Sequence, residues 1–216
     1  MRAIIIAGGQ VKEGDAWQRW VQDGDWIIGV DGGAARAWGW GLVPEMVIGD
    51  MDSLPSADRV ALEERDCQFI EHPRAKDETD LELALTYAVQ EGVREIIILG
   101  ALGGRLDHTL ANVLLLALPS LEGVSVRIGE GREETLLLRG GETATLQGRE
   151  GDLVSLLPLG GDAYGVTTSG LAWELRNDTL RFGFSRGVSN ELTAPQARIE
   201  VGEGCLLLVH GPSPDE

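Results

Sequence analysis

The sequence predicts an α/β domain with a parallel sheet, followed by a small antiparallel all-β sandwich domain. Continuous apolar, β-branched segments alternate with helical patterns in the first part of the chain. Such uninterrupted strands are typical of parallel sheets that helices cover on both faces, the doubly wound arrangement. Helical periodicity ends near Arg127, and short strand-like segments then alternate with glycine-rich turns up to His210. Strands at that spacing favour a sandwich.

The first domain is expected at residues 1–128. We expect its strands at Ala3 to Ala7, Trp26 to Val30, Met46 to Ile48, Gln68 to Ile70 and Glu95 to Leu99. A helix is predicted from Thr79 to Gln90, where Thr79 and Glu82 have the spacing of a capping box. A second helix is predicted from Asp107 to Leu118. The side chains expected to face a core from this helix are Leu110, Val113, Leu114 and Ala117.

The second domain is expected at residues 134–212, after a glycine-rich, charged linker at 129–133 and before a frayed tail at 213–216. We expect its strands at Glu134 to Leu138, Thr143 to Leu146, Leu153 to Pro158, Leu171 to Leu175, Thr179 to Phe182, Ala197 to Val201 and Cys205 to Val209.

Composition narrows the functional class. The chain has 216 residues, is 43% hydrophobic and carries a formal net charge of −17, with Lys12 and Lys76 as its lysines. Nucleic-acid binders need basic surfaces, so no nucleic-acid partner is expected. Cys67 and Cys205 lie far apart and predict neither a zinc site nor a disulfide. No segment approaches the length of a membrane span, so we expect no membrane association and a cytoplasmic location.

Carboxylates follow the strand-like segments. Asp50 and Asp52 come directly after Met46 to Ile48, and alternation along an extended chain would point both to one side, where they could share a cation. The structural alternative is an Asp-rich turn whose side chains bond their own backbone. Asp77 and Asp80 lie at a helix start beside Lys76, a suitable partner for phosphate oxygens. Helix capping alone would also explain these two residues.

Two glycine pairs follow strands in the same way. Gly103-Gly104-Arg105-Leu106-Asp107-His108 opens a helix, where free amide groups and Arg105 suit an anion, although Asp107 could be only a cap. Asp31 precedes Gly32-Gly33 and could bond a ribose, a base or a metal-bound water. The glycines match neither the dinucleotide fingerprint nor the P-loop, so the domain is expected to be Rossmann-like without a dinucleotide site.

Together, these motifs in this order resemble those of the thiamine pyrophosphokinase family, bacterial type. The second half agrees, because residues 168–175 and 185–191 resemble the thiamine-side segment of bacterial members. The resemblance implies a Mg²⁺-dependent transfer of a diphosphate group from ATP to the hydroxyl of thiamine, giving thiamine diphosphate and AMP. It also implies a homodimer with sites between subunits.

The resemblance also implies residue roles. The catalytic residues would be Asp80, Arg105 and Asp107; whether Asp107 or a metal-bound carboxylate deprotonates the alcohol stays open. Magnesium would be held by Asp50, Asp52, Asp77 and Asp80. The nucleotide would contact Asp31, Gly32, Asp50, Lys76, Asp77, Thr79, Gly103, Arg105 and His108. Thiamine would contact Asp52, Asp80, Trp173, Ser189 and Asn190, with the indole of Trp173 stacked on the cationic ligand.

Two alternatives remain open. A metal-dependent nucleotide-sugar transferase would use an Asp-x-Asp motif after a strand, but it leaves the Arg105 segment and the thiamine-side segment unexplained. A non-catalytic sensor of nucleotide or thiamine would keep the pocket without turnover. Its signature would be the loss of an acidic residue or of Arg105, and both kinds of residue are present.

Overall fold

The computed structural model describes residues 1–9, 11 and 17–213. The chain divides into two compact units, Met1–Gly131 and Arg132–Glu216. The segment expected to be a linker, 129–133, overlaps the last residues of β6 (Ser125–Glu130) and the first residue of β7 (Glu133–Arg139).

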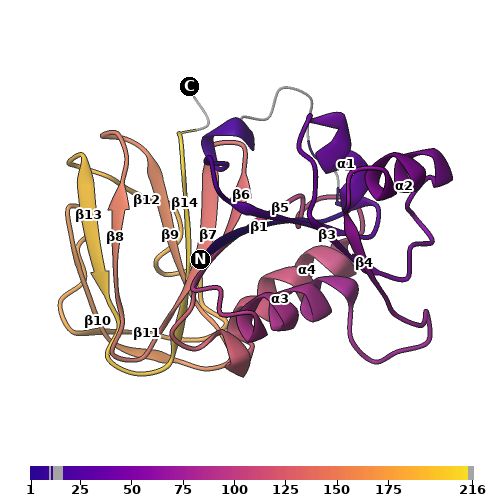
Figure 1. Cartoon of the computed structure of the whole chain (residues 1–216). Helices are drawn as coiled ribbons and strands as arrows, with labels where there is room; N and C mark the ends of the chain where they lie inside the picture. The colour runs from indigo at the N-terminus through magenta and orange to yellow at the C-terminus, as the bar shows by residue number, and fades with distance from the viewer. Residues whose placement is uncertain (10, 12–16, 214–216) are drawn as a thin grey trace. The chain divides into compact units, whose positions relative to one another are not determined.

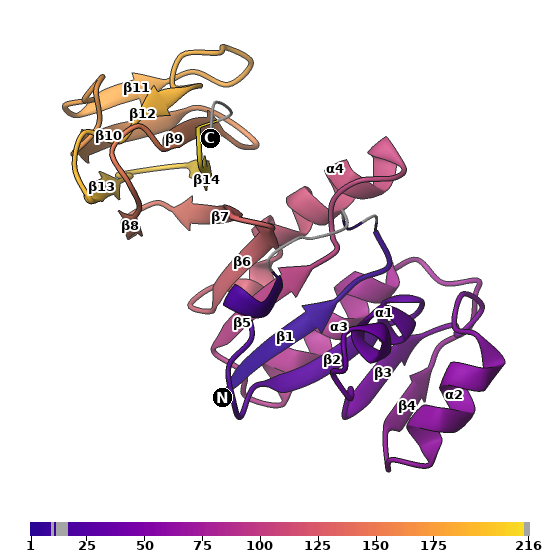
Figure 2. The same ribbon diagram turned by 90° about the horizontal axis from the view of Figure 1, so that it is seen from above.

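The first unit contains parallel strands in the order β6-β5-β1-β2-β3-β4, which lie side by side in Figures 1 and 2. The strands other than β6 are β1 (Arg2–Ile6), β2 (Trp26–Val30), β3 (Met46–Gly49), β4 (Gln68–Glu71) and β5 (Glu95–Leu99). Ile4, Ile5 and Ile6 are fully buried, so β1 is covered on both faces. The predicted α/β class of this unit is confirmed, although β6 was not predicted.

Helices cover the sheet on both sides: in Figure 1, α3 (Asp80–Gln90) and α4 (Leu106–Leu114) lie below it and α1 (Gly33–Gly39) above. α2 (Ser56–Glu63) lies between β3 and β4 in the sequence, and 3₁₀ turns occur at Trp17–Arg19, Leu115–Ala117 and Pro119–Leu121. The predicted cap of α3 is confirmed, because the Thr79 side chain accepts a hydrogen bond from the backbone N–H of Glu82.

The apolar face predicted for the second helix is wrong. α4 ends at Leu114 and continues as a 3₁₀ turn, and Leu110 and Leu114 are 54% and 55% exposed. Ala117 is also exposed and Val113 is only half-buried, whereas Leu115 and Leu116 are buried. The tighter turn changes which residues face inward from Leu115 to Ala117, whereas Leu110 and Leu114 lie in the α-helix itself and are exposed there.

The second unit contains two antiparallel sheets whose buried residues form one core, as the predicted sandwich requires. One sheet has the order β12-β9-β14-β7 and the other β11-β10-β13-β8. The strands other than β7 are β8 (Thr143–Gln147), β9 (Leu153–Pro158), β10 (Ala163–Ser169), β11 (Asp178–Leu180), β12 (Asn190–Glu191), β13 (Gln196–Glu200) and β14 (Cys205–Gly211). The antiparallel all-β character is confirmed; β10 and β12 were not predicted.

The strand predicted from Leu171 to Leu175 is instead a loop. Gly170, with φ +78°, turns the chain out of β10, and a Cβ there would lie 2.4 Å from the carbonyl oxygen of Gln196. Leu171 and Leu175 are buried at the two ends of the loop, and Trp173 between them is exposed. The apolar residues therefore anchor a loop, although they suggested a strand.

Among the described helices, none has the length and apolar character needed to cross a membrane.

Candidate active site

A cavity of about 730 Å³ opens where β1, β2, β3 and β5 end. The chain passes from β1 to β2 on one side and later returns to β5 on the other side of β1. Open α/β sheets bind ligands at such a switch point, outside the carboxyl ends of the strands. The cavity therefore lies where the sequence motifs were expected to meet.

Close backbone approach shapes this end of the sheet. A Cβ on Gly33 would lie 1.9 Å from the carbonyl oxygen of Ile6, so only glycine lets α1 begin directly against β1. The backbone N–H of Gly9 donates to the carbonyl oxygen of Gly100 over 2.8 Å, which joins the loops after β1 and β5. Gly9 is one of the residues that line the cavity, so the second contact helps to position the lining.

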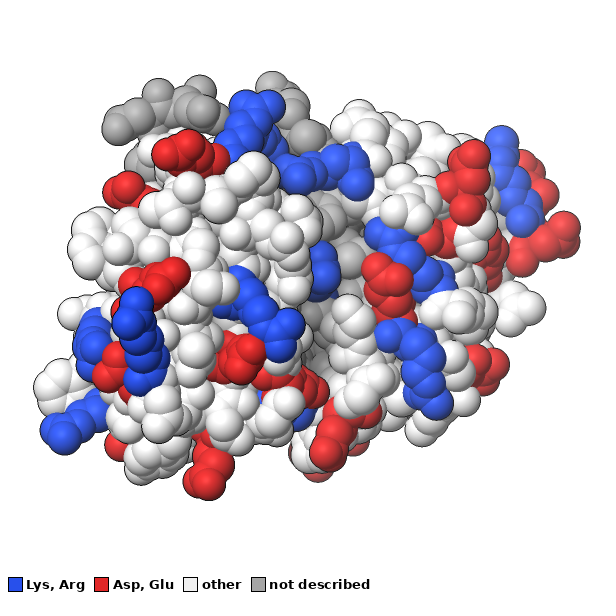
Figure 3. Space-filling model, turned by 90° about the vertical axis from the view of Figure 1, so that its left-hand side faces the viewer, with Lys and Arg blue, Asp and Glu red and all other residues white. Residues whose placement is uncertain are grey.

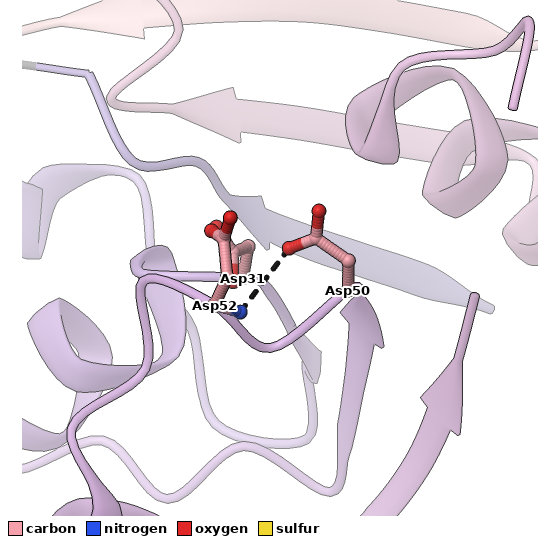
Figure 4. Close-up of side chains that lie close together, drawn as sticks. All are labelled: Asp31, Asp50 and Asp52. Carbon is pink, nitrogen blue, oxygen red and sulfur yellow. Dashed lines mark hydrogen bonds between the residues drawn. The ribbon is translucent and has the colours of Figure 1, made fainter. Parts of the chain in front are cut away.

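Three carboxylates, those of Asp31, Asp50 and Asp52, lie with one oxygen each within 4.8 Å of one another (Figure 4). We call them the aspartate group. Asp31 follows β2 with φ +47°, while Asp50 and Asp52 follow β3. Their oxygens are hard ligands of the kind that Mg²⁺ prefers. The group can therefore hold a divalent cation.

The geometry of the aspartate group differs from the extended chain expected from alternation. Met51, with φ +61°, turns the backbone between Asp50 and Asp52. The backbone N–H of Asp52 donates to Asp50 Oδ1 at 3.1 Å, and that of Ser53 donates to Asp31 Oδ1 at 3.3 Å. The alternative interpretation as an Asp-rich turn is thus correct for the backbone, yet the same turn brings the carboxylates together.

Asp80 extends this acidic region from the start of α3. A Cβ on Gly49 would lie 3.1 Å from Asp31 Cβ and 3.3 Å from Asp80 Oδ1, so the two aspartates flank that glycine. Asp80 Oδ1 is buried and forms an ion pair with Lys76 Nζ at 3.0 Å, but this contact lacks hydrogen-bond geometry. A buried carboxylate oxygen without a hydrogen bond is costly, which suits a site completed by a ligand.

The other residues predicted in this segment lie differently. Thr79 and Lys76 line the cavity. Asp77 is exposed and is not among the lining residues in the described part of the chain. The structure therefore groups Asp31, rather than Asp77, with Asp50 and Asp52.

The cavity lining also includes Gly103, Arg105 and His108, which follow β5 in the sequence. Arg105 holds Asp107 through two hydrogen bonds, from Nε to Oδ1 at 3.1 Å and from Nη2 to Oδ2 at 2.5 Å. This hydrogen bonding lowers the pKa of Asp107 to about 2, against the smaller opposing effect of desolvation. A carboxylate with so low a pKa is a poor proton acceptor at neutral pH.

Sequence reasoning missed several lining residues, among them Arg74, Ser53 and Asn112. Arg74 Nε lies 3.7 Å from Asp52 Oδ2, and Asn112 Nδ2 donates to the carbonyl oxygen of Ala101 at 2.7 Å. Arg74 lies two residues before Lys76 in the same loop, and this spacing could have predicted a second cationic side chain at the cavity.

The remaining predicted residues lie in the second unit. Trp173 is 61% exposed, and its backbone N–H donates to the side chain of Asn190. Ser189, with φ +58°, directly precedes Asn190, and its backbone N–H donates to Ser155 Oγ at 3.1 Å. The structure thus brings Trp173 and Asn190 together within this unit.

Charge elsewhere on the surface is mixed. On the face drawn in Figure 3, Lys and Arg side chains lie among Asp and Glu side chains. Exposed ion pairs such as Arg198 with Glu200 and Arg59 with Glu71 illustrate this pattern.

Comparisons with known proteins agree over both units. A family profile described as "Thiamin pyrophosphokinase, catalytic domain" matches residues 17–128, and one described as "Thiamin pyrophosphokinase, vitamin B1 binding domain" matches residues 143–206. The thiamine pyrophosphokinase of Bacillus subtilis is 28% identical over 182 residues, which cover 84% of this chain and 85% of that protein. For a thiamine pyrophosphokinase 1 of Oryza sativa the identity is 27%, over 72% of this chain and 62% of that protein.

Solved structures agree as well. The thiamin pyrophosphokinase of Geobacillus thermodenitrificans superposes with a TM-score of 0.85 at 27% identity and covers 99% of each chain. The enzyme of Candida albicans, at 16% identity and a TM-score of 0.82 over 98% of this chain and 89% of that one, shares the fold. The catalytic-domain profile alone spans more than half of the sequence. The chain belongs to the thiamin pyrophosphokinase family.

Proposed function

We propose that this protein transfers a diphosphate group from ATP to the hydroxyl of thiamine, giving thiamine diphosphate and AMP in a Mg²⁺-dependent reaction. The observation that carries the proposal is the cavity at the strand ends. It joins the acidic residues Asp31, Asp50 and Asp80 to the cationic residues Lys76 and Arg105. Clustered carboxylates with cationic side chains among them, such as Lys76 beside Asp80 at 3.0 Å, suit a metal-bound triphosphate.

The donor set fits magnesium. The aspartate group offers three carboxylate oxygens within 4.8 Å, and Asp80 Oδ1 adds a buried oxygen without a hydrogen bond. We assign Asp50, Asp52 and Asp80 as ligands of Mg²⁺. Asp31 is added because it belongs to the aspartate group. Asp77, which is exposed, stays a more distant candidate. Bound there, the metal would neutralise charge on the triphosphate and help to align it.

The protein's own cations would hold the nucleotide. Lys76 and Arg105 both line the cavity and would contact phosphate oxygens, with Arg74 as a third candidate. Asp31 and Gly32 after β2, Thr79 before α3, and Gly103 and His108 beside Arg105 complete the proposed nucleotide contacts.

The reaction needs the thiamine hydroxyl in line with the β-phosphorus. A bond forms between that oxygen and the β-phosphorus, and the bond from the β-phosphorus to the oxygen bridging it to the α-phosphorus breaks, so that AMP leaves. Asp107 is held by Arg105 through two hydrogen bonds and is not among the cavity-lining residues in the described part of the chain, whereas Asp80 lines the cavity. We assign the carboxylate of Asp80 to orient the hydroxyl and accept its proton, and Asp107 to hold Arg105.

Thiamine would bind through the exposed indole of Trp173 and the nearby Ser189, together with Asp52 and Asp80, and Asn190, expected as a further contact, lies directly beside Trp173. The exposed aromatic face supports this assignment, because thiamine is cationic and aromatic faces attract cations.

We accordingly propose residues 1–128 as the ATP- and Mg²⁺-binding domain and 134–212 as the thiamine-binding domain. The strand order, with β1 between β2 and β5, supports a doubly wound, Rossmann-like class for the former. The cytoplasmic location stays a prediction.

We also propose a homodimer with sites at the subunit interface. The support is the exposed row of Leu106, Leu110 and Leu114 on α4, at 72%, 54% and 55% exposure. These residues are spaced by one helical turn and adjoin the cavity segment at Arg105. Sedimentation at micromolar concentration tests the dimer, and a fully active monomer would contradict it.

The activity is tested by incubating the purified protein with ATP, Mg²⁺ and thiamine and separating the products by chromatography. We expect AMP and thiamine diphosphate in equal amounts, and no product when EDTA is present. ADP with thiamine monophosphate would instead show transfer of a single phosphoryl group. Thiamine binding without any product would favour the sensor, and turnover of a nucleotide sugar would favour the transferase alternative.

A further inference from the structure

We propose that Asn190 is a positioning residue for thiamine binding, because it holds the backbone of Trp173 and thereby fixes the exposed indole ring. The proposal rests on the proposed function, which assigns Trp173 to thiamine. It replaces the expected direct contact between Asn190 and thiamine with an action through Trp173.

The side-chain amide of Asn190 is used by backbone groups. The N–H of Trp173 donates to Asn190 Oδ1 at 3.0 Å, and Asn190 Nδ2 donates to the carbonyl oxygen of Trp173 at 2.8 Å. The N–H of Glu191 also donates to Asn190 Oδ1, at 2.9 Å. Because Asn190 is only 5% exposed, its amide faces the protein.

The loop that carries Trp173 has other anchors on either side. Before Trp173, the N–H of Ala172 donates to the carbonyl oxygen of Glu191 at 2.9 Å. After it, the N–H of Leu175 donates to Thr168 Oγ1 at 2.8 Å. Between these anchors, both backbone polar groups of Trp173 bond to Asn190. Loss of the amide should therefore release Trp173 while the ends of the loop remain attached.

The position of Asn190 makes it a firm support. Asn190 lies in β12 and pairs with Val154 of β9, in one sheet of the sandwich. Trp173 lies between β10 and β11, which belong to the other sheet. The amide therefore ties a loop of one sheet to a strand of the other, so that the strand can hold the loop in place.

An exposed tryptophan needs such a support if it is to bind a ligand. The ring is 61% exposed, so packing restrains it little. Fixing the backbone before binding reduces the conformational freedom that the ligand would otherwise have to remove. Weakening this support should raise the KM for thiamine and leave the chemical step nearly unchanged.

The test is a double-mutant cycle with Asn190→Ala, Trp173→Ala and the double variant, and with Thr193→Ala as the control. Thr193 is an exposed neighbour on the same segment and is outside the proposed thiamine contacts. We expect Asn190→Ala to raise the KM for thiamine about tenfold, with kcat and the KM for ATP little changed. In the Trp173→Ala background, Asn190→Ala should have no further effect, whereas Thr193→Ala should behave as wild type.

Effects that multiply in the double variant would mean that Asn190 acts on thiamine independently, which would overturn the proposal. An unchanged KM in Asn190→Ala would overturn it as well. Thermal unfolding of each variant shows whether the fold is intact. If Asn190→Ala does not fold, Asn190→Asp keeps the acceptor for both N–H groups, replaces the donor to Trp173 with an oxygen that repels its carbonyl group, and adds a negative charge; we expect the same direction of change.

Amide hydrogen exchange separates this proposal from the thiamine assignment of Trp173. In Asn190→Ala, the Trp173 amide should exchange at least about tenfold faster, while the amide of Leu175 should not. Suppose that the Trp173 amide exchanges faster in Asn190→Ala, while Trp173→Ala leaves the KM for thiamine unchanged. Asn190 would then position Trp173, but Trp173 would not bind thiamine, and the thiamine assignment would fail. Unchanged exchange at Trp173 would refute the positioning role itself.

Discussion

Acidic side chains gather in both units, but their surroundings differ. In the first unit the aspartate group places three carboxylates within 4.8 Å of one another, and Arg74 is 3.7 Å from one of them. In the second unit the half-buried Glu134 and the buried Asp152 lie on the two sides of His210. Glu134 Oε1 lies 3.1 Å from His210 Nδ1, and Asp152 Oδ2 lies 3.8 Å from Nε2. We call these three residues the His210 cluster.

The difference indicates what each arrangement is for. Like charges held close together repel one another, so the aspartate group is expected to lower stability until a cation binds. Buried carboxylates around an imidazole have a polar partner, and loss of that partner would be costly. We therefore expect changes in the first unit's acidic region to affect turnover, and changes in the His210 cluster to affect folding.

The largest effect is expected for Asp80→Ala. This change removes the buried oxygen near Asp31 and the ion-pair partner of Lys76, so kcat should fall by about 1,000-fold with the fold intact. Steady-state assays of AMP release and circular dichroism measure the two quantities. Asp66→Asn is the matched control, because Asp66 is an exposed aspartate with φ +60°, a conformation that asparagine tolerates. Retained turnover in Asp80→Ala would contradict the metal and catalytic assignments.

The next effect concerns the His210 cluster. His210→Leu should lower the free energy of unfolding by about 1 to 3 kcal/mol, because the Glu134 carboxylate loses the imidazole at 3.1 Å, whereas Asp152 keeps the N–H of Arg149. Urea unfolding measures the change, and Glu134→Gln, which keeps a polar group beside the ring, should cost less. We expect the folded His210→Leu protein to keep its kcat. A large loss of kcat without a loss of stability would show that the comparison between the two clusters is wrong.

The positions of these acidic residues could be predicted only in part. Asp50 and Asp31 follow apolar strands, and parallel strands bring such residues to one edge of the sheet, so their place was readable from the sequence. The left-handed backbone at Asp31 and Met51, at φ +47° and +61°, was not readable, because non-glycine residues adopt it only where the surrounding structure enforces it. That backbone decides which carboxylates meet.

Apolar patterns misled in both units for one reason. The leucines of α4 and those of the loop at 171–175 were expected to follow the period of a buried element. Leu110 and Leu114 are exposed, and Leu171 and Leu175 anchor a loop. Periodicity shows which residues share an apolar face, but not whether that face packs on the chain's own core, anchors a loop or stays exposed for a partner subunit, as we propose for α4.

A smaller, opposite effect on stability is expected within the aspartate group. Asp50→Asn keeps the oxygen that accepts from the N–H of Asp52 and removes one negative charge from the group. In EDTA, the free energy of unfolding should therefore rise by about 0.5 to 1 kcal/mol, while Mg²⁺ should stabilise the variant less than it stabilises the wild type. Thermal unfolding with and without Mg²⁺ measures both. Equal stabilisation of both proteins by Mg²⁺ would argue against a metal ligand at Asp50.

The smallest effect concerns the pH dependence of Asp107→Asn. Hydrogen bonding from Arg105 stabilises the ionised carboxylate and lowers its pKa to about 2. The contribution of this pair to the free energy of unfolding is therefore lost only as the pH falls toward that value. Between about pH 5 and 9 Asp107 therefore stays ionised and adds no limb to the profile of kcat/KM. The variant should show a modestly lower kcat, because Arg105 loses a bidentate partner, with the acid limb at the wild-type position. A displaced or missing acid limb would make Asp107 the proton acceptor and would remove that role from Asp80.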